Sequence, residues 1–339
     1  MTFAWSILLP AFAAAVLLVL LHPATVVAGP EDDMAFVLPT PDCAVPLTDG
    51  ATGCSAEDPE DIEKKRAQLR NYAREREASR VRNHYADMRR FQTEEYVTRM
   101  ENEFGKLDKA NMTLRQAFKL LEEYVDASDP DMELPNIVHA FQAAEAARRD
   151  GQPDWLQLTA LVHDLGKMMF AFGKDEDGMS GRADGPQWAL GGDTWVLGSP
   201  IPDTAVYSEF NKLNADHRAL NGVSKNKNGT GLRNLRFPWG HDEYAYRILS
   251  HPKNGCKLPE IALQMVRLHS CYPMHSKRAY DHLLAPGDEK ILDGVILFNK
   301  YDLYSKADAT IKDLERAWPY YETLIDKYFE GGSQRLIHF

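Results

Sequence analysis

The sequence predicts an all-α fold, and three observations support this prediction. Apolar residues recur at helical spacing in many segments, as they do at Leu158, Leu161 and Leu165. Some of these segments follow a helix-start signal, such as the capping box formed by Thr113 and Gln116. No run of alternating apolar and polar residues marks a strand. With 339 residues, of which 44% are hydrophobic and 26% charged, the chain can bury a large core.

The amino-terminal segment has the composition of a targeting or membrane segment. Residues Phe3 to Leu21 are apolar apart from Ser6, and the first charged residue is Glu31. The small residues that end at Ala28 suit a signal peptidase, which predicts that residues 1–28 are a cleaved secretory signal. An uncleaved membrane anchor is the alternative, since 19 residues just span a bilayer. Residues 29–57 then form a linker, in which Cys43 and Cys54 can pair in an oxidising compartment.

Residues 58–339 are predicted to form one helical domain. A charge-dense helical region runs from residue 58 to about residue 106, and the capping box starts the next helix. Pro135 suits the first turn of a helix that runs towards Arg149, and Asp154 can cap a helix that reaches about Phe172. Residues 173–238 are rich in Gly, Asn, Asp and Pro and are expected to be irregular. The helical pattern resumes at residues 241–249, 259–268, 288–304 and 311–328.

The charge balance limits the possible partners. Lys and Arg total 39 and Asp and Glu total 50, so the formal net charge is −11. This acidic balance argues against broad nucleic-acid binding, because phosphate backbones recruit basic surfaces. A membrane partner is expected only if the amino-terminal segment remains as an anchor. Four cysteines in a chain of this length do not make a disulfide scaffold.

Five predicted helical elements each carry a side chain that can bind a metal. A solitary histidine is more often a core residue, but the adjacent pair His163-Asp164 is more specific. Neighbouring helical residues diverge by about 100°, so the imidazole can point at one ion while the carboxylate bridges to a second. Four histidines and two carboxylates suit one or two ions of Fe, Mn, Co or Zn. The predicted ligands are His139, His163, Asp164, His241, His269 and Asp302.

The same residues carry a family resemblance. His139, His163-Asp164 and Asp302 match the H…HD…D signature of HD-domain metalloproteins. The surrounding motifs run in order from Leu69 to Tyr328 and resemble the inositol oxygenase family. They include Asp126-Ala-Ser-Asp-Pro-Asp131, His139-Ala-Phe-Gln142, His163-Asp-Leu-Gly-Lys167, Gly192-Asp-Thr194, Trp239-Gly-His-Asp-Glu-Tyr244, Arg267-Leu-His-Ser270 and Phe298-Asn-Lys-Tyr-Asp-Leu-Tyr304. This resemblance implies a single HD-type helical bundle around a dinuclear metal site, with long irregular loops.

The resemblance also implies an activity and a set of roles. The family cleaves the ring of myo-inositol with O2 to give D-glucuronate, using a mixed-valent Fe(II)/Fe(III) pair. By this match, one iron takes His139, His163, Asp164 and Asp302. Asp164 bridges to the second iron, whose other ligands are His241 and His269. Lys167 and Asp164 match the catalytic positions, and the positions around the inositol hydroxyls match Arg70, Asp126, Ser128, Lys167, Gly192, Asp193, Ser270 and Lys306.

General chemistry is consistent with these implied roles. A metal-bound hydroxyl loses its proton near neutral pH, and the ammonium group of Lys167 can stabilise the developing negative charge. A polyol carries a hydroxyl on every ring carbon, so its pocket needs many hydrogen-bonding groups. The alternative for Lys167 is a cation that stabilises the carboxyl end of a helix. His275 is expected to support a ligand rather than to bind a metal itself.

Two other functions and three departures from the family accompany this interpretation. An HD-type phosphohydrolase would use similar ligands to activate water, and a non-catalytic protein would keep only the helical shell. The amino-terminal segment points to the secretory route or a membrane, whereas the family alone suggests a cytoplasmic enzyme. The segments Lys174 to Asp184 and Asn221 to Arg236 resemble insertions that can reshape the rim of the pocket.

Overall fold

The structure is a computed structural model that describes residues 77–126, 128, 135–182, 184–304 and 311–339. By its internal contacts the chain divides into the units Met1–Ala56 and Glu57–Phe339, and every described residue belongs to the second unit. The predicted signal or anchor, the linker with Cys43 and Cys54, and the site candidates Arg70 and Lys306 therefore lie outside the described residues. Within the described ranges, no helix combines the length and apolar character that crossing a bilayer requires.

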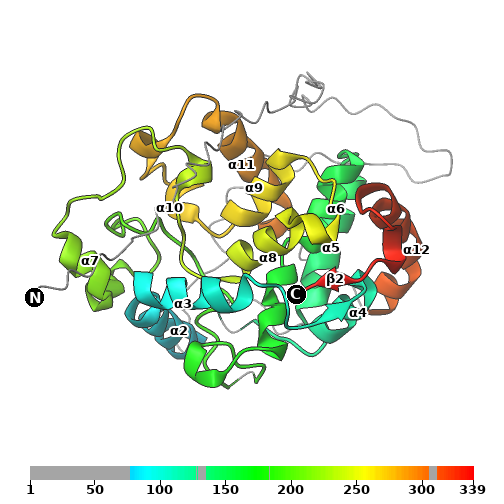
Figure 1. Cartoon of the computed structure of the whole chain (residues 1–339), viewed down its shortest axis with the longest axis horizontal. Helices are drawn as coiled ribbons and strands as arrows, with labels where there is room; N and C mark the ends of the chain where they lie inside the picture. The colour runs from blue at the N-terminus through cyan, green and yellow to red at the C-terminus, as the bar shows by residue number, and fades with distance from the viewer. Residues whose placement is uncertain (1–76, 127, 129–134, 183, 305–310) are drawn as a thin grey trace, which may run out of the picture. The chain divides into compact units, whose positions relative to one another are not determined.

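Helices dominate the described part of the chain, which confirms the predicted all-α class (Figure 1). The α-helices are α2 (Glu77–Phe91), α3 (Glu94–Phe104), α4 (Leu114–Leu121), α5 (Asn136–Arg149), α6 (Asp154–Val162), α7 (Ala215–Leu220), α8 (His241–Ser250), α9 (Glu260–Leu268), α10 (Tyr272–His275), α11 (Asp288–Tyr304) and α12 (Ile311–Tyr328). The capping box is present, because Thr113 accepts from the Gln116 amide while the Gln116 side chain accepts from the Thr113 amide.

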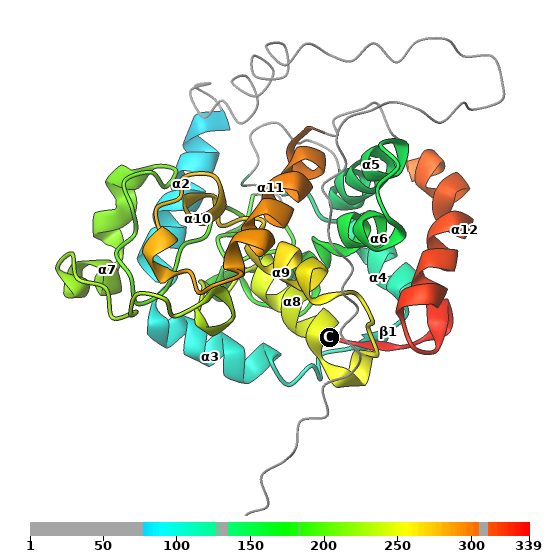
Figure 2. The ribbon, with the colours of Figure 1, turned by 90° about the horizontal axis from the view of Figure 1, so that it is seen from above.

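The helices that matter for the site pack in pairs. Helix α5 lies along α6, helix α8 along α9, and α11 packs against both α9 and α5 (Figure 2). Helix α12 covers α6 and α5 from outside this group. The arrangement brings helices that are far apart in the sequence around one region of the core.

One short sheet was not predicted. Strand β1 (Asn111–Met112) pairs antiparallel with β2 (Ile337–His338), with Asn111 opposite His338. Each strand has two residues, which is too short to show an alternating pattern in the sequence. The sheet joins the carboxyl-terminal segment to the residues that precede α4.

The helix predicted to run from Trp155 to about Phe172, capped by Asp154, is interrupted. Helix α6 ends at Val162, and the chain continues as a 3-10 helix, η1 (Leu165–Ala171). His163 and Asp164 occupy the junction between them, and the residue at the cap of α6 is Pro153 rather than the predicted Asp154. Docking of η1 on α8 accounts for the interruption, because Gly166 packs directly on the backbone of His241.

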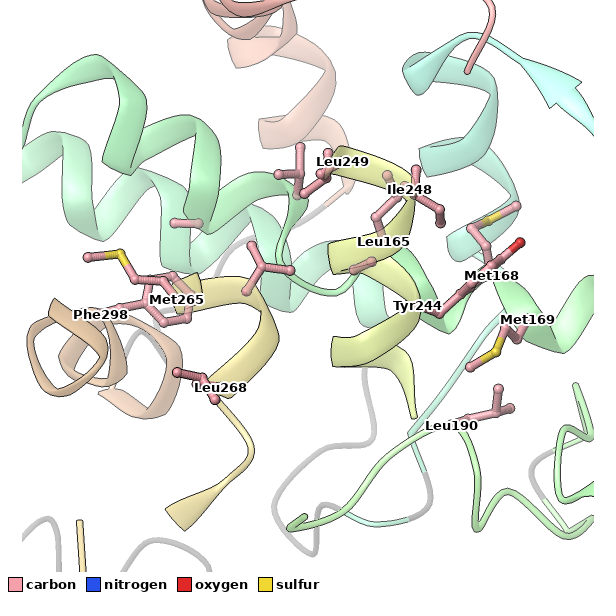
Figure 3. Packing of buried hydrophobic residues seen from close by; sticks show 14 of the residues in the cluster. Leu165, Met168, Met169, Leu190, Tyr244, Ile248, Leu249, Met265, Leu268 and Phe298 are labelled. Carbon is pink, nitrogen blue, oxygen red and sulfur yellow. The ribbon is translucent and has the colours of Figure 1, made fainter. Parts of the chain in front are cut away.

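Apolar packing holds η1 against α8. Leu165, Met168 and Met169 are fully buried, and Figure 3 shows them beside Tyr244 and Ile248 of α8. Burying a large apolar side chain contributes about 1.5–3 kcal/mol, so this contact fixes the position of the His163-Asp164 junction relative to α8.

Residues 173–238 form the long irregular region that was predicted. Apart from residue 183, which is not described, they contain only short helical segments, namely η2 (Asp175–Asp177), η3 (Ser208–Leu213), α7 and η4 (Leu232–Asn234). The region is nevertheless packed, because Trp188, Leu190, Trp195 and Leu197 are buried. The segment therefore covers the core rather than extending from it.

Candidate metal centre

Helices α5, α8, α9 and α11 and the junction after α6 bring the six predicted ligands together. His139 lies in α5, His241 is the first residue of α8, His269 caps the end of α9 and Asp302 lies in α11. Five of the six residues are buried, and His139 is partly exposed. Buried charged and imidazole groups are costly unless they are paired or bind a metal.

The first group of ligands surrounds the carboxylate of Asp302. His139 Nε2 lies 2.9 Å from Asp302 Oδ1. His163 Nε2 lies 3.4 Å from the same oxygen and 3.4 Å from Asp164 Oδ2. The ligand atoms of His139, His163 and Asp302 all lie within 4.8 Å of one another, close enough to hold one ion.

The second group lies on the other side of Asp164. His241 Nε2 is 3.0 Å from His269 Nε2. Asp164 Oδ1 lies 3.4 Å from His241 Nε2 and 3.8 Å from His269 Nε2. Asp164 therefore presents Oδ2 to His163 and Oδ1 to His241 and His269, which is the orientation that a carboxylate bridging two metal ions needs.

Backbone carbonyls orient two of the imidazole rings. His163 Nδ1 donates to the carbonyl of Ala160 at 2.8 Å, and His269 Nδ1 donates to that of Val266 at 2.7 Å. Each donation leaves the Nε2 lone pair free for a metal. His163 Nε2 is buried and has no hydrogen-bond partner among the described residues, which costs about 1–3 kcal/mol without a ligand. These donors fit a metal ion.

The electrostatics of the group favour ionised carboxylates and neutral imidazoles at His241 and His269, whereas burial lowers the pKa of His163 but Asp164 and Asp302 outweigh it and raise that pKa. Burial alone would raise the pKa of Asp164, but His163 and Lys167 outweigh it and hold this pKa well below its usual range. Burial alone would also raise the pKa of Asp302, but His139 and His163 outweigh it and hold that pKa well below its usual range. Burial lowers the pKa of His269 to about 4, and the nearby His163 acts in the same direction. A neutral imidazole is the form that binds a metal.

Lys167 forms a buried ionic cluster beside the bridging carboxylate. Its Nζ atom lies 2.7 Å from Asp126 Oδ2 and 3.0 Å from Asp164 Oδ2. Asp126 Oδ1 accepts hydrogen bonds from the Ser128 amide at 2.8 Å and the Ser128 hydroxyl at 2.7 Å. Burial opposes the charge of Lys167, but Asp126 and Asp164 raise its pKa above the usual value. Lys167 lies in the middle of η1, so the alternative of a cation at a helix end is wrong.

The loop with Gly192 and Asp193 lies against this cluster. A Cβ atom at Gly191 would come within 2.7 Å of the Ser128 hydroxyl, so the loop backbone lies directly on the segment that carries Ser128. Gly192 has φ +96°, a left-handed conformation that favours glycine. Asp193 Oδ1 accepts from the Tyr85 hydroxyl at 3.1 Å.

Ser270 joins the loop to the second group of ligands. Its hydroxyl lies 3.3 Å from His241 Nε2, and its carbonyl accepts from the Thr194 amide at 2.8 Å. These contacts thus link four of the predicted substrate-side residues to the ligands, namely Lys167, Asp126, Ser128 and Ser270. Gly192 and Asp193 lie on the adjoining loop and contact α2.

Sequence reasoning missed two residues that support the site. Asn136 is fully buried at the start of α5, and its Nδ2 atom donates to Asp164 Oδ2 at 2.8 Å. His84 of α2 lies 3.1 Å from the carbonyl of Gly191 through its Nε2 atom. The position of Asn136 directly after Pro135, at the start of a predicted helix, was the available signal for this residue. No such signal marked His84, because it lies in a charge-dense region. His275 Nε2 lies 3.0 Å from the backbone carbonyl of His269, so it contacts the backbone rather than the imidazole of that ligand.

Comparison with known proteins agrees with this geometry. Residues 78–336 match the family model described as myo-inositol oxygenase. An inositol oxygenase of Dictyostelium discoideum is 40% identical over 276 residues, covering 79% of this chain and 90% of the relative. Inositol oxygenase of Homo sapiens is 37% identical over 279 residues, covering 81% and 93%. Inositol oxygenase 2 of Arabidopsis thaliana is 42% identical over 244 residues, covering 70% and 73%. The chain therefore belongs to the myo-inositol oxygenase family.

Proposed function

We propose that this chain cleaves the ring of myo-inositol with O2 to give D-glucuronate, using two iron ions. Family membership makes it an inositol oxygenase. The reaction balances as C6H12O6 + O2 → C6H10O7 + H2O, so it is a four-electron oxidation of the substrate. The observation that carries the two-metal proposal is the carboxylate of Asp164, whose two oxygens face different histidines.

The proposed ligand sets follow from the distances between donor atoms. His139, His163, Asp302 and Asp164 Oδ2 would hold the first ion, and His241, His269 and Asp164 Oδ1 the second. Six protein ligands shared between two ions would leave positions open for substrate and O2. When bound, a mixed-valent Fe(II)/Fe(III) pair would pass electrons from the substrate to O2 and would supply the Lewis acidity that makes a coordinated hydroxyl acidic.

Lys167 would stabilise the negative charge that appears when the substrate hydroxyl loses its proton. Its ammonium group is held at the bridging carboxylate by two ion pairs and keeps its proton. Because the group is buried, its electrostatic effect is stronger than it would be in water. The lysine also neutralises part of the charge of Asp126, which lowers the cost of burying that carboxylate.

The remaining polar residues would orient the ring of the polyol. Asp126 and Asp193 offer carboxylate oxygens, Ser128 and Ser270 offer hydroxyls, and Gly192 lets the loop backbone approach closely. Arg70 and Lys306 would add donors from segments outside the described residues. Hydrogen bonds to most hydroxyls of the ring would select a polyol over an apolar substrate.

A phosphohydrolase is less consistent with the site. A phosphate ester favours several surrounding cations, yet Lys167 is the only cation among the predicted substrate-side residues that the structure describes. Asp126 offsets the positive charge of this lysine, which makes the cluster a weaker site for a phosphate. The non-catalytic alternative is also less consistent, because all six ligands are present and lie close together.

We also propose that residues 1–28 are a cleaved signal or an anchor, as their composition predicts. The intact mass of the mature chain from its native source tests this proposal. The mass of a chain that begins near residue 29 would support cleavage. The mass of the full chain, found in a membrane fraction, would support an anchor. The full mass in the cytosolic fraction would contradict both.

The activity is tested by identifying the product of the full chain loaded with Fe(II). We expect D-glucuronate from myo-inositol in the presence of O2 and no product under argon, as detected by NMR. Phosphate release from inositol phosphates should not exceed the rate of a D164N variant. Metal-dependent phosphate release without glucuronate would favour the phosphohydrolase instead.

A further inference from the structure

A buried ion pair joins the two helices that carry His241 and His269. Arg267 Nε donates to Glu243 Oε2 at 2.7 Å, and the two side chains are only 7% and 4% exposed. Glu243 follows His241 by two residues in α8, and Arg267 precedes His269 by two residues in α9. The pair therefore links the start of α8, which carries His241, to the end of α9, which carries His269.

Arg267 also holds the segment that leads into α8. Its Nη2 atom donates to the carbonyl of Leu235 at 3.0 Å, and its guanidinium lies 5.1 Å from the centre of the Phe237 ring. It also lies 4.8 Å from the centre of the Tyr246 ring in α8. A lysine has neither the planar fork nor these directed donors, so it cannot reproduce the contacts.

Glu243 is equally constrained. Its second oxygen, Oε1, accepts from Arg247 Nε at 2.9 Å, and Arg247 Nη2 reaches Glu101 of α3 at 2.8 Å. Both oxygens of the buried carboxylate are thus occupied, so the side chain has a single orientation. Fully partnered buried ionic groups impose geometry even where they add little net stability.

We propose that Arg267 and Glu243 are positioning residues that set the separation of His241 and His269, and so the affinity of the second metal position. His241 is the first residue of its helix and His269 lies at the end of its own, where helices fray. Their Nε2 atoms lie 3.0 Å apart, so a small shift of either end changes the site. This proposal rests on the proposed function only in requiring that this position binds a metal.

The two metal positions should respond differently. His139, His163 and Asp302 come from α5, the junction after α6 and α11, none of which carries a member of the pair. Loss of the ion pair should therefore weaken binding at the second metal position and leave binding at the first unchanged. A residue that only stabilised the fold would affect both positions together.

The test is titration of the metal-free full chain with Co(II), whose visible spectrum reports coordination, in competition with a chelator. We expect R267K and E243Q each to weaken the second metal about 10- to 100-fold, as changes to residues that support a ligand usually do. The affinity of the first metal should not change. The matched control is R233K, since Arg233 Nε pairs with Glu260 Oε1 at 3.0 Å on the exposed surface of the same loop and helix. R233K should bind both metals as the wild type does.

A single variant could fail to fold because it leaves one buried charge without its partner. The double variant E243Q/R267M removes both charges and so avoids this cause of unfolding. It should also lose affinity for the second metal alone. Wild-type affinity of both metals in a folded R267K, E243Q or double variant would overturn the proposal. Equal weakening of the two metals would overturn it as well. The titration contains no inositol or O2, so failure of the oxygenase assignment would leave its result unchanged.

Discussion

Gly166 packs directly on the backbone carbonyl of His241, and a Cβ atom at position 166 would overlap that carbonyl. This contact explains why a glycine follows the His163-Asp164 pair by two residues. It lets η1 approach the start of α8, which brings His241 to within 3.4 Å of Asp164 Oδ1. A side chain at this position would separate the bridging carboxylate from the second group of ligands.

The variant G166A should therefore lose the second metal and most activity. Overpacking of this kind costs about 1–3 kcal/mol of unfolding free energy, because the obstacle is backbone rather than a flexible side chain. Metal content per chain and thermal unfolding measure the two effects. The control is G294A in α11, where a Cβ atom would meet the flexible end of Met265. Normal metal content in G166A would show that the close contact is not needed.

Loss of Asp164 and loss of His241 should have different consequences. D164N removes a ligand from both positions, so we expect it to lower the occupancy of both metals and to abolish activity. H241A removes a ligand from one position and should retain about one metal per chain at His139, His163 and Asp302. Elemental analysis after desalting gives the two stoichiometries. Two tightly bound metals in D164N would contradict the bridging role.

Lys167 should matter for turnover more than for metal binding. We expect K167M to retain both metals and to lose nearly all activity, because it lacks the ammonium group proposed to stabilise the negative charge of the substrate. It leaves Asp126 buried without its main partner, which costs about 3–5 kcal/mol of stability. The double variant K167M/D126N should regain stability but not activity. Thermal unfolding and glucuronate formation separate the two effects, and an active K167M would remove Lys167 from the mechanism.

Asn136 should fix the orientation of Asp164. Its amide donates to Asp164 Oδ2 at 2.8 Å, so N136A should leave that oxygen freer to rotate and weaken metal binding. We expect a loss of about 10- to 100-fold in affinity, as measured by chelator competition. N136D should be worse, since it places a second negative charge beside Asp164. Equal affinities in the wild type and N136A would mean that η1 alone orients the carboxylate.

Removal of metal should destabilise the protein. The ligands come from four helices and a junction, so a bound ion cross-links elements that are distant in the sequence. A ligand present at about 100 times its dissociation constant adds about 2.7 kcal/mol per site. Differential scanning calorimetry before and after dialysis against a chelator should therefore show a lower melting temperature without metal. An unchanged melting temperature would show that the ligands are held in place by packing alone.

The sequence was most informative where local signals decide the structure. The capping box at Thr113 and helix α11 from Asp288 to Tyr304 follow directly from side-chain patterns. The six ligands could be named because the adjacent His163-Asp164 pair is specific and because the surrounding motifs resemble the inositol oxygenase family. Their convergence on Asp164 agrees with the predicted bridging carboxylate.

Other features depend on contacts between distant segments and could not be predicted in this way. The interruption after Val162 depends on docking of η1 against α8, which no local pattern reveals. The roles of His84 and Asn136 depend on partners that lie 107 and 28 residues away in the chain. The β1–β2 pairing joins segments from opposite ends of the described chain.

The central claim is that this site couples O2 reduction to cleavage of an inositol ring. The most direct test is O2 uptake by the full chain, loaded anaerobically with Fe(II) and a reductant, with and without myo-inositol. We expect uptake that depends on inositol, with one O2 consumed for each D-glucuronate formed. A chain that holds two irons yet shows no inositol-dependent uptake would contradict it.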